Sequence, residues 1–298
     1  MRQAYRNQVA LLVETLPLIA RETCFALKGG TAINLFYRDM PRLSVDIDLA
    51  YVHFDDRATA ISNIDAALSR LAKSLTSLGH TATVQGHAEK KIIVSNRGTS
   101  IKIEPNYTLR GWVFEPSVQG IALKAEAEFG YAEIAVVSKP ELYGGKMCAA
   151  LDRQHPRDLF DIAGLFASDA PVERLLDGFV AMLLCHNRPI HELLNPTPKD
   201  QTEVLKKEFE GMTDAPFTYT DHLAAFETLL KFLRSGVAPY RQLLLDFVSL
   251  KADLSRALIP NLDRLPAIGW KQENLRRLQS ENPKKFEEQY EKLYNLLK

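Results

Sequence analysis

The chain has 298 residues, of which 46% are apolar and 25% charged, a globular composition that excludes wholesale disorder and a coiled coil. Lysine plus arginine and aspartate plus glutamate each number 37, so bulk charge gives no argument for a nucleic-acid or membrane partner. No run reaches the ~18 apolar residues of a membrane span, and Cys24, Cys148 and Cys185 are too widely spaced for a disulfide framework. We therefore expect a cytoplasmic protein with free thiols and no N-terminal export signal.

The first half of the chain mixes helical and strand patterns. Helical spacing of apolar residues predicts a helix over 5–21, and the apolar run 25–27 predicts a strand that ends in a tight turn at Gly29-Gly30. Thr31 is placed to cap the next helix, which Pro41 ends. The other elements predicted before residue 138 are a strand at 45–51, a helix at 61–78, a hairpin of strands 91–95 and 100–104, and a strand at 132–137.

After Ser138 the pattern is almost entirely helical. The run GFVAMLLC, from Gly178 to Cys185, indicates a buried helix segment, and the stretch 195–198 with its two prolines is the predicted loop. The predicted helices are 139–151, 157–166, 171–186, 200–210, 221–234, 238–258 and 271–297. The sequence thus predicts an α+β chain in which a mixed lobe, residues 1–138, precedes an all-helical lobe, residues 139–298.

Two aspartates on one predicted strand follow the glycine turn after a single helix. Because side chains alternate along a strand, Asp46 and Asp48 project from one face while Ile47 points to the core. Neighbouring carboxylates repel each other unless a cation lies between them, and such oxygen ligands suit a Mg²⁺ that also binds substrate phosphates. The turn at Gly29-Gly30 lets backbone amides approach a phosphate, and a helix start there would attract it. Each motif is weak alone, but together they indicate a site for a nucleoside triphosphate.

A third acid lies on the second strand of the predicted hairpin. Alternation along Ile101–Glu104 places Lys102 and Glu104 on the face opposite the isoleucines. Next to the two aspartates, Glu104 would complete an acidic triad, in which it would bind a second metal ion or accept a proton from an attacking hydroxyl. The alternative is a Lys–Glu pair on a solvated face, and the sequence leaves both open.

A second group of charged residues lies in the helical half. Lys146 stands mid-helix among small and apolar residues, so it either reaches out to water or faces a phosphate. Asp158 and Asp161 share one helix face near a helix start, where the helix dipole by itself also favours acids. Arg153 and Arg157 belong to the same charged group.

Signatures of several other site classes are absent from the sequence. The histidines show no zinc-binding spacing, and there is no GxSxG, Walker A or GxGxxG sequence. Ala50 stands where an aspartate-nucleophile phosphatase would have threonine or valine. A nucleotide-sugar glycosyltransferase, which also uses an Asp-x-Asp motif, usually has a βαβ nucleotide-binding half upstream, whereas only one strand precedes the motif here.

Three stretches resemble the AbiEii/AbiGii toxin family, which includes the MenT toxins and belongs to the DNA polymerase-β-like nucleotidyltransferase superfamily. These are Lys28-Gly29-Gly30-Thr31-Ala32, then Arg42-Leu43-Ser44-Val45-Asp46-Ile47-Asp48-Leu49, and Lys146 followed by Arg157-Asp158-Leu159-Phe160-Asp161. The resemblance covers roughly residues 25–166. In this sequence Gly-Gly replaces the frequent Gly-Ser of the first motif, and Glu104 replaces the usual aspartate of the third strand.

The resemblance implies a bilobed, Mg²⁺-dependent nucleotidyltransferase that transfers a nucleoside monophosphate from an NTP. It implies a toxin of a toxin–antitoxin or abortive phage-infection system with a cognate antitoxin, and in the MenT branch the acceptor is the 3′ end of tRNA. Gly29, Gly30 and Thr31 would hold phosphates, Asp46 and Asp48 would bind Mg²⁺ with Glu104, and Asp158 would be the essential later acid. Lys146, Arg153 and Arg157 would contact the triphosphate, so the helical domain 139–298 would contribute to the site of the catalytic domain 1–138.

Two other functions remain open at the level of the sequence. The first is nucleotidyl transfer to a protein or a small molecule, and the second is RNA binding without catalysis. An RNA acceptor needs a positive surface, for which the stretch Lys271–Lys298 is the candidate. Glutamates interleave its basic residues, so an ordinary solvated helix is equally compatible with this stretch.

Overall fold

The computed structural model describes residues 1–168 and 172–298. It contains two compact units: Met1–Ser138 with Phe209–Pro216, and Lys139–Glu208 with Phe217–Lys298. The first unit carries a seven-stranded sheet with helices, and the regular elements of the second are all helical within the described residues. The predicted α+β class is confirmed.

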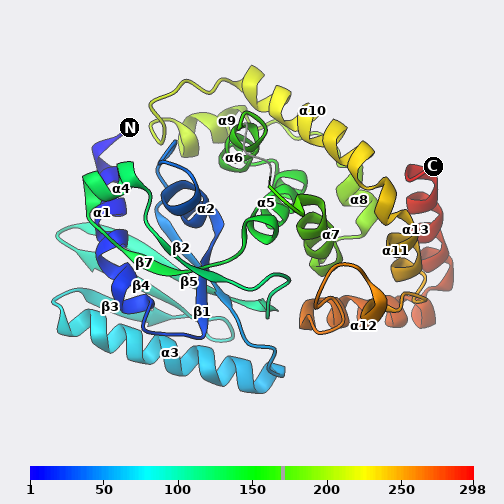
Figure 1. Cartoon of the computed structure of the whole chain (residues 1–298), viewed down its shortest axis with the longest axis horizontal. Helices are drawn as coiled ribbons and strands as arrows, with labels where there is room; N and C mark the ends of the chain where they lie inside the picture. The colour runs from blue at the N-terminus through cyan, green and yellow to red at the C-terminus, as the bar shows by residue number, and fades with distance from the viewer. Residues whose placement is uncertain (169–171) are drawn as a thin grey trace. The chain divides into compact units, whose positions relative to one another are not determined.

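The sheet of the first unit is mixed, with the strand order β3-β4-β5-β2-β1-β7-β6 (Figure 1). β2 runs parallel to β5 and β1 parallel to β7, while the other neighbours are antiparallel. The strands are β1 Phe25–Lys28, β2 Asp46–Tyr51, β3 Thr81–Gln85, β4 Lys91–Asn96, β5 Thr99–Arg110, β6 Ser117–Gly120 and β7 Glu133–Val136. The predicted strands are confirmed, whereas β3 and β6, both at the sheet edges, were not predicted, because their polar side chains give no clear apolar alternation.

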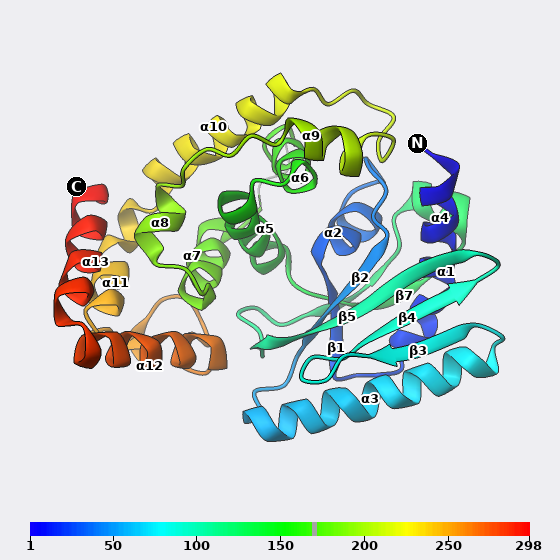
Figure 2. The same ribbon diagram turned by 180° about the vertical axis from the view of Figure 1, so that it is seen from behind.

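Two helices cover the apolar face of this sheet. α1 (Gln3–Ile19) buries Val9, Leu12 and Leu16, and α3 (Arg57–Ser77) packs along β3, as Figure 2 shows. Ile47 and Ile103 are fully buried beneath them. The side chains of Asp46 and Asp48 therefore project from the opposite face of the sheet. The short helix α4 (Leu123–Phe129) was not predicted from the sequence.

The glycine turn is itself the start of a short helix, and among the described residues no side chain caps that helix. α2 (Gly29–Ala32) continues directly into a π-helical turn, Ile33–Tyr37. The prediction that Thr31 caps this helix is wrong, because the helix already starts at Gly29. The Thr31 hydroxyl is fully buried and lies 2.6 Å from the backbone oxygen of Asp46, to which it donates. Thr31 thereby ties α2 to the start of β2.

The second unit is built from helices of very different lengths. The predicted start of one helix at residue 171 lies outside the described residues, and that helix begins at Leu175. The helices are α5 Lys139–Arg153, α6 Pro156–Phe166, α7 Leu175–Cys185, α8 Ile190–Leu194, α9 Thr202–Val204, α10 Tyr219–Gly236, α11 Arg241–Val248, α12 Pro266–Glu281 and α13 Pro283–Leu296. The predicted helix 271–297 is interrupted at Asn282, because Pro283 disfavours helical backbone at the residue before it.

α5 and α7 pack against each other through glycines. A Cβ on Gly144 would lie 2.4 Å from the backbone of Gly178, and one on Gly178 would lie 1.9 Å from the carbonyl oxygen of Pro140. Only residues without a side chain permit this approach. α7 is buried from Gly178 to Cys185, which confirms the predicted buried helix. Among the described residues, no helix combines the length and apolar character that crossing a bilayer requires.

Candidate active site

The acidic face of the sheet lies where β2 runs beside β5. In the register of these parallel strands, Asp46 is opposite Lys102 and Asp48 is opposite Glu104. Directly opposed residues of neighbouring strands project to the same face, so Glu104 lies beside the two aspartates as the alternation predicts. On the other side of β2, Lys28 of β1 is opposite Asp48. Three acids and two lysines thus share one face of the sheet over three adjacent strands.

Two lysines form ion pairs with these acids. The Lys102 ammonium lies 3.1 Å from Glu104 Oε2 and 3.6 Å from Asp46 Oδ1, and Lys91 Nζ lies 3.3 Å from Glu104 Oε1. Partial burial by itself would raise the pKa of Glu104, but the two lysines outweigh it and lower that pKa below its ordinary value. Burial likewise opposes the charge of Lys102, while Glu104 and Asp46 raise its pKa. Glu104 and Lys102 therefore stabilise each other's charged forms.

Gly29 brings the glycine turn into contact with the Asp-x-Asp motif. Its φ is +73°, in the left-handed region that favours glycine. A Cβ at this position would lie 2.1 Å from Oδ2 of Asp48. The Asp48 carboxylate therefore occupies the space that any other residue at position 29 would fill. The two motifs are adjacent because β1 and β2 are antiparallel neighbours, which places the end of β1 beside the start of β2.

Arg42 is a buried charge that the sequence reasoning did not single out. Only 2% of the residue is exposed, and its guanidinium donates to the backbone oxygen of Leu43 at 2.9 Å. A Cβ on Gly30 would lie 2.6 Å from this guanidinium and 2.9 Å from Ser44 Oγ. The segment before β2 therefore packs closely against the glycine turn. The available signal was an arginine four residues before Asp46 in an otherwise apolar and small stretch.

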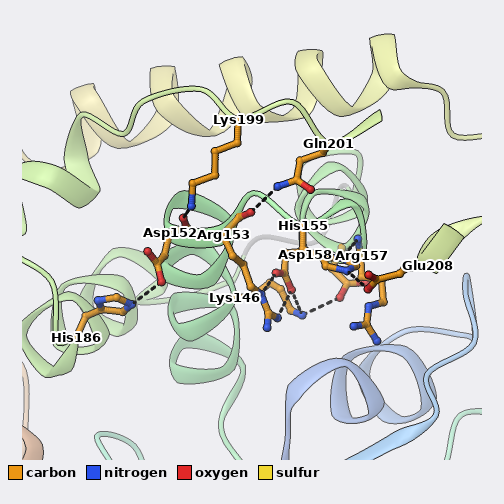
Figure 3. A network of polar contacts seen from close by, with 11 residues as sticks. Lys146, Asp152, Arg153, His155, Arg157, Asp158, His186, Lys199, Gln201 and Glu208 are labelled. Atoms are coloured by element: carbon orange, nitrogen blue, oxygen red, sulfur yellow. Dashed lines mark hydrogen bonds and ion pairs between the residues drawn. The ribbon is translucent and has the colours of Figure 1, made fainter. Parts of the chain in front are cut away.

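The second unit contains a buried cluster of opposite charges, drawn in Figure 3. Lys146 of α5 lies 2.8 Å from Asp158 Oδ1 and 3.1 Å from Asp161 Oδ2, and both aspartates on α6 are fully buried. Arg153 contacts Asp158 through two nitrogens, at 2.5 Å and 3.0 Å. Burial would raise the pKa of Asp158, but Lys146 and Arg153 hold it well below its usual range. Asp158 is thus a carboxylate at neutral pH that accepts from two cations.

The two cations of this cluster differ in accessibility. The Arg153 side chain is 58% exposed, whereas the Lys146 side chain is only 7% exposed. Hydrogen bonds fix the backbone around Arg153: the Gln201 amide donates to the Arg153 carbonyl at 2.9 Å, and Gln154 bonds the chain at Thr197 and Lys199. Arg153 is therefore an exposed cation on a well-anchored turn.

Arg157 precedes Asp158 in the first turn of α6. The side chain of His155 caps this helix by accepting from the Arg157 amide at 3.1 Å, and its other ring nitrogen lies 3.0 Å from Glu208 (Figure 3). The structure thus brings together Asp46, Asp48, Glu104 and Gly29 in the first unit. It brings together Lys146, Arg153 and Asp158 in the second.

The comparisons with known proteins assign the chain to a family. The family model described as "Nucleotidyl transferase AbiEii toxin, Type IV TA system" matches residues 10–232. The chain belongs to the AbiEii nucleotidyltransferase toxin family. It is therefore a nucleotidyltransferase and a toxin of the toxin–antitoxin type.

A solved structure shares the fold of this AbiEii protein. MenT4, a nucleotidyltransferase toxin from Mycobacterium tuberculosis H37Rv, aligns with a TM-score of 0.59 at 13% sequence identity, over 98% of this chain and 95% of MenT4. The search of curated proteins finds no match. At this identity the likeness shows a shared fold, and it extends over nearly the whole chain.

The acids of the AbiEii protein fit a divalent cation. Asp46 and Asp48 supply hard oxygen ligands from one strand face, and Mg²⁺ commonly takes one or two protein carboxylates and completes its shell with substrate phosphates and water. The Asp48 carboxylate can take its position because Gly29 has no side chain. Among the residues that the structure describes, no three His, Cys, Asp or Glu side chains group closely enough to hold a metal alone. An ion bound here would rely on the substrate for its remaining ligands.

Proposed function

We propose that this AbiEii nucleotidyltransferase uses Mg²⁺ to transfer a nucleoside monophosphate from an NTP to the 3′ end of tRNA. The added nucleotides would prevent aminoacylation and so block translation, until a cognate antitoxin relieves the effect. The observation that carries the proposal is the contact between the Gly29 turn and Asp48, on a strand face that also carries Asp46. Family membership and the MenT-type fold support it.

The reaction replaces a phosphoanhydride bond of the NTP with a phosphodiester bond to the acceptor. The oxygen of the acceptor 3′-hydroxyl bonds to the α-phosphorus of the NTP, the bond from this phosphorus to the bridging oxygen breaks, and pyrophosphate leaves. The hydroxyl proton passes to a base, for which the carboxylates of Asp46 and Asp48 are the candidates. A bound Mg²⁺ would supply positive charge to the phosphates and lower the repulsion that an attacking hydroxyl meets.

The residues of the first unit would position the triphosphate. The backbone amides of the turn at Gly29 and Gly30, which packs against Asp48 and Arg42, would bind the phosphates. Thr31 would act indirectly, because its hydroxyl bonds the backbone oxygen of Asp46 and the hydroxyl of Ser44. These bonds fix the start of the strand that carries the two aspartates. The guanidinium of Arg42 packs against the same turn at Gly30.

The residues of the second unit would meet the charge of the leaving pyrophosphate. Arg153 is the exposed cation of the cluster and is the better candidate for direct contact, with Arg157 beside it on α6. Lys146 is held between Asp158 and Asp161, and a phosphate that approached it would replace part of this pairing. Asp158 orients Lys146 and Arg153, so its essential role would be to position them.

An incorporation assay tests the acceptor. The purified protein is incubated with total tRNA, Mg²⁺ and each of the four α-labelled NTPs in turn. Label at the tRNA 3′ end, sensitive to removal of the terminal nucleotides, is the expected result. Label in protein or in a small molecule would replace the proposed acceptor, and RNA binding without incorporation would favour the non-catalytic alternative.

The variant Asp46→Ala tests the role of the Asp-x-Asp motif. Asp46 is partly exposed and lies outside the apolar core, so the variant should fold. We expect transfer to fall by about 100- to 1,000-fold, as on removal of one group that stabilises transition-state charge, with an unchanged circular dichroism spectrum. Transfer at the wild-type rate would remove Asp46 from the mechanism.

A further inference from the structure

Lys102 lies where the carboxylates of two neighbouring strands face each other. Its ammonium is 3.6 Å from Asp46 Oδ1 on β2 and 3.1 Å from Glu104 Oε2 on its own strand, β5. The register places Lys102 directly opposite Asp46, so this bridge follows from the pairing of β2 with β5. A single positive charge therefore lies between two acids of the active-site face.

The third acid already has both of its oxygens engaged. Glu104 Oε1 is 3.3 Å from Lys91 Nζ, and Oε2 accepts from Lys102. To bind a metal, Glu104 would have to give up at least one of these ion pairs. The lysines would then be left beside the metal, and like charges at such distances repel strongly in a partly buried site. Glu104 is thus arranged to hold lysine rather than a metal ion.

In two-metal enzymes the ions lie about 3.5–4 Å apart and are held by carboxylates that they share. Here Glu104 is directly opposite Asp48 and diagonal to Asp46, so a second ion that used Glu104 would share it with one of these aspartates. Lys102 contacts Asp46 from the side of Glu104. The ammonium therefore takes the position that a second ion shared by Asp46 and Glu104 would need.

We propose that Lys102 takes the place of a second metal ion, so that the active site binds one divalent cation, through Asp46 and Asp48, and Glu104 serves to position Lys102. The inference rests on the proposed metal dependence of the nucleotidyl transfer. It assigns to Lys102 the positive charge that a second metal ion supplies in two-metal enzymes. It also explains why a glutamate suits position 104, because its side chain is one methylene longer than that of aspartate and reaches Lys102, two residues away on the same strand.

Counting bound Mn²⁺ tests the inference without measuring activity. Free Mn²⁺ is followed by electron paramagnetic resonance during titration of the full chain, with and without a non-hydrolysable NTP analogue. We expect one Mn²⁺ per chain for the wild type and a second for Lys102→Met, because the variant frees Asp46 and Glu104 from the ammonium. Two ions on the wild type, or a single ion on Lys102→Met, would overturn the inference.

Two further variants separate a ligand from a positioning residue. Glu104→Gln should weaken Mn²⁺ binding less than Asp48→Asn does, because Glu104 reaches the metal ligand Asp46 only through Lys102. Asp48→Asn removes a ligand and should weaken binding by at least about tenfold. A loss of affinity in Glu104→Gln as large as that in Asp48→Asn would make Glu104 a ligand and refute the proposal, and this comparison holds even if Lys102→Met fails to fold.

Lys90→Met is the matched control. Lys90 is the neighbour of Lys91 and is similarly exposed, but its ammonium pairs with Asp65 at 2.6 Å. This variant should bind one Mn²⁺, and a second ion on it would show that removal of any lysine in the hairpin has the same effect. The count is independent of the acceptor: one bound ion with no label in tRNA would leave the inference standing while the proposed function fails.

Discussion

Gly29 shows how a single backbone conformation links two motifs. Its left-handed φ of +73° and its contact with Asp48 are separate constraints. The first would cost a non-glycine residue about 1–3 kcal/mol, as residues in sparsely populated backbone regions do. The second can be relieved only by moving the Asp48 carboxylate, because a Cβ at position 29 would lie 2.1 Å from its Oδ2. Function should therefore be more sensitive than stability to substitution at this position.

We expect Gly29→Ala to reduce transfer at least about 100-fold, the cost of misplacing a catalytic group by about 1 Å. The free energy of unfolding, measured by urea denaturation, should fall by about 1–3 kcal/mol. Gly98→Ala is the control, because Gly98 has a similar φ of +78° and no atom lies within 4 Å of its Cβ position. The control should lose comparable stability and keep its transfer rate; equal activity of both variants would contradict the assigned contact.

At the scale of elements, helix α12 carries a buried lysine, Lys271. The sequence places Lys271 at the start of a basic surface stretch, and for this residue the expectation is wrong. Its side chain is buried, and its ammonium donates to the carbonyl oxygens of Leu183 and Arg188 at 3.0 Å and 3.1 Å. Burial lowers its pKa from 10.5 to about 8, with Cys185 and Cys148 nearby. The lysine therefore joins α12 to the end of α7 rather than facing a nucleic acid.

This burial predicts a pH dependence of stability. Below about pH 8 the ammonium is charged in the folded and unfolded states alike, and the folded state bears the cost of burying it. Between about 8 and 10.5 the folded chain releases the proton while the unfolded chain keeps it, so Lys271 favours folding more as pH rises. The wild type should gain stability relative to Lys271→Met over this range, measured by urea denaturation at several pH values.

A matched control for this effect is Lys284→Met, because Lys284 is exposed on α13. The difference between its unfolding free energy and that of the wild type should stay constant over the same pH range. A constant difference for Lys271→Met as well would show that the burial of Lys271 does not govern its proton affinity.

At the scale of the molecule, the first unit is completed by a distant segment. Residues Phe209–Pro216 belong to it although the 70 residues before them, Lys139–Glu208, belong to the second unit. The Leu43 amide donates to Met212 O at 2.7 Å, and the Arg2 amide donates to Gly211 O at 2.8 Å. The returning segment therefore holds the chain just before β2, which carries the aspartates.

A chain that ends at residue 138 should consequently lose order before β2. We expect the Leu43 amide, protected in the full chain, to exchange with solvent in the shortened chain, as observed by hydrogen–deuterium exchange. The Val52 amide, which donates to Cys24 O within residues 1–138, is the internal reference and should stay protected. Equal protection of Leu43 in both chains would mean that the returning segment is dispensable.

The sequence by itself determined the local features of this protein. Alternation along β2 placed Asp46 and Asp48 opposite the buried Ile47, and the spacing of apolar residues predicted the helical second half, because both periodicities are set by the backbone of one element. It missed β3, β6 and α4, whose polar or short segments lack such a pattern. The motif resemblance to AbiEii toxins, which the family match confirms, depended equally on residues close together in the chain.

The tertiary structure decided which residues from different elements meet. The bridge from Lys102 to Asp46, the packing of Arg42 against the glycine turn, the burial of Lys271 and the return of Phe209–Pro216 all join segments that no periodicity connects. Their partners depend on strand register and helix packing, which are properties of the whole fold. For Glu104 the sequence left a metal ligand and a lysine pair open, and alternation along β5 already placed Lys102 on the same face. The register of β5 against β4 and β2 then added Lys91 to its carboxylate and brought Asp46 to Lys102.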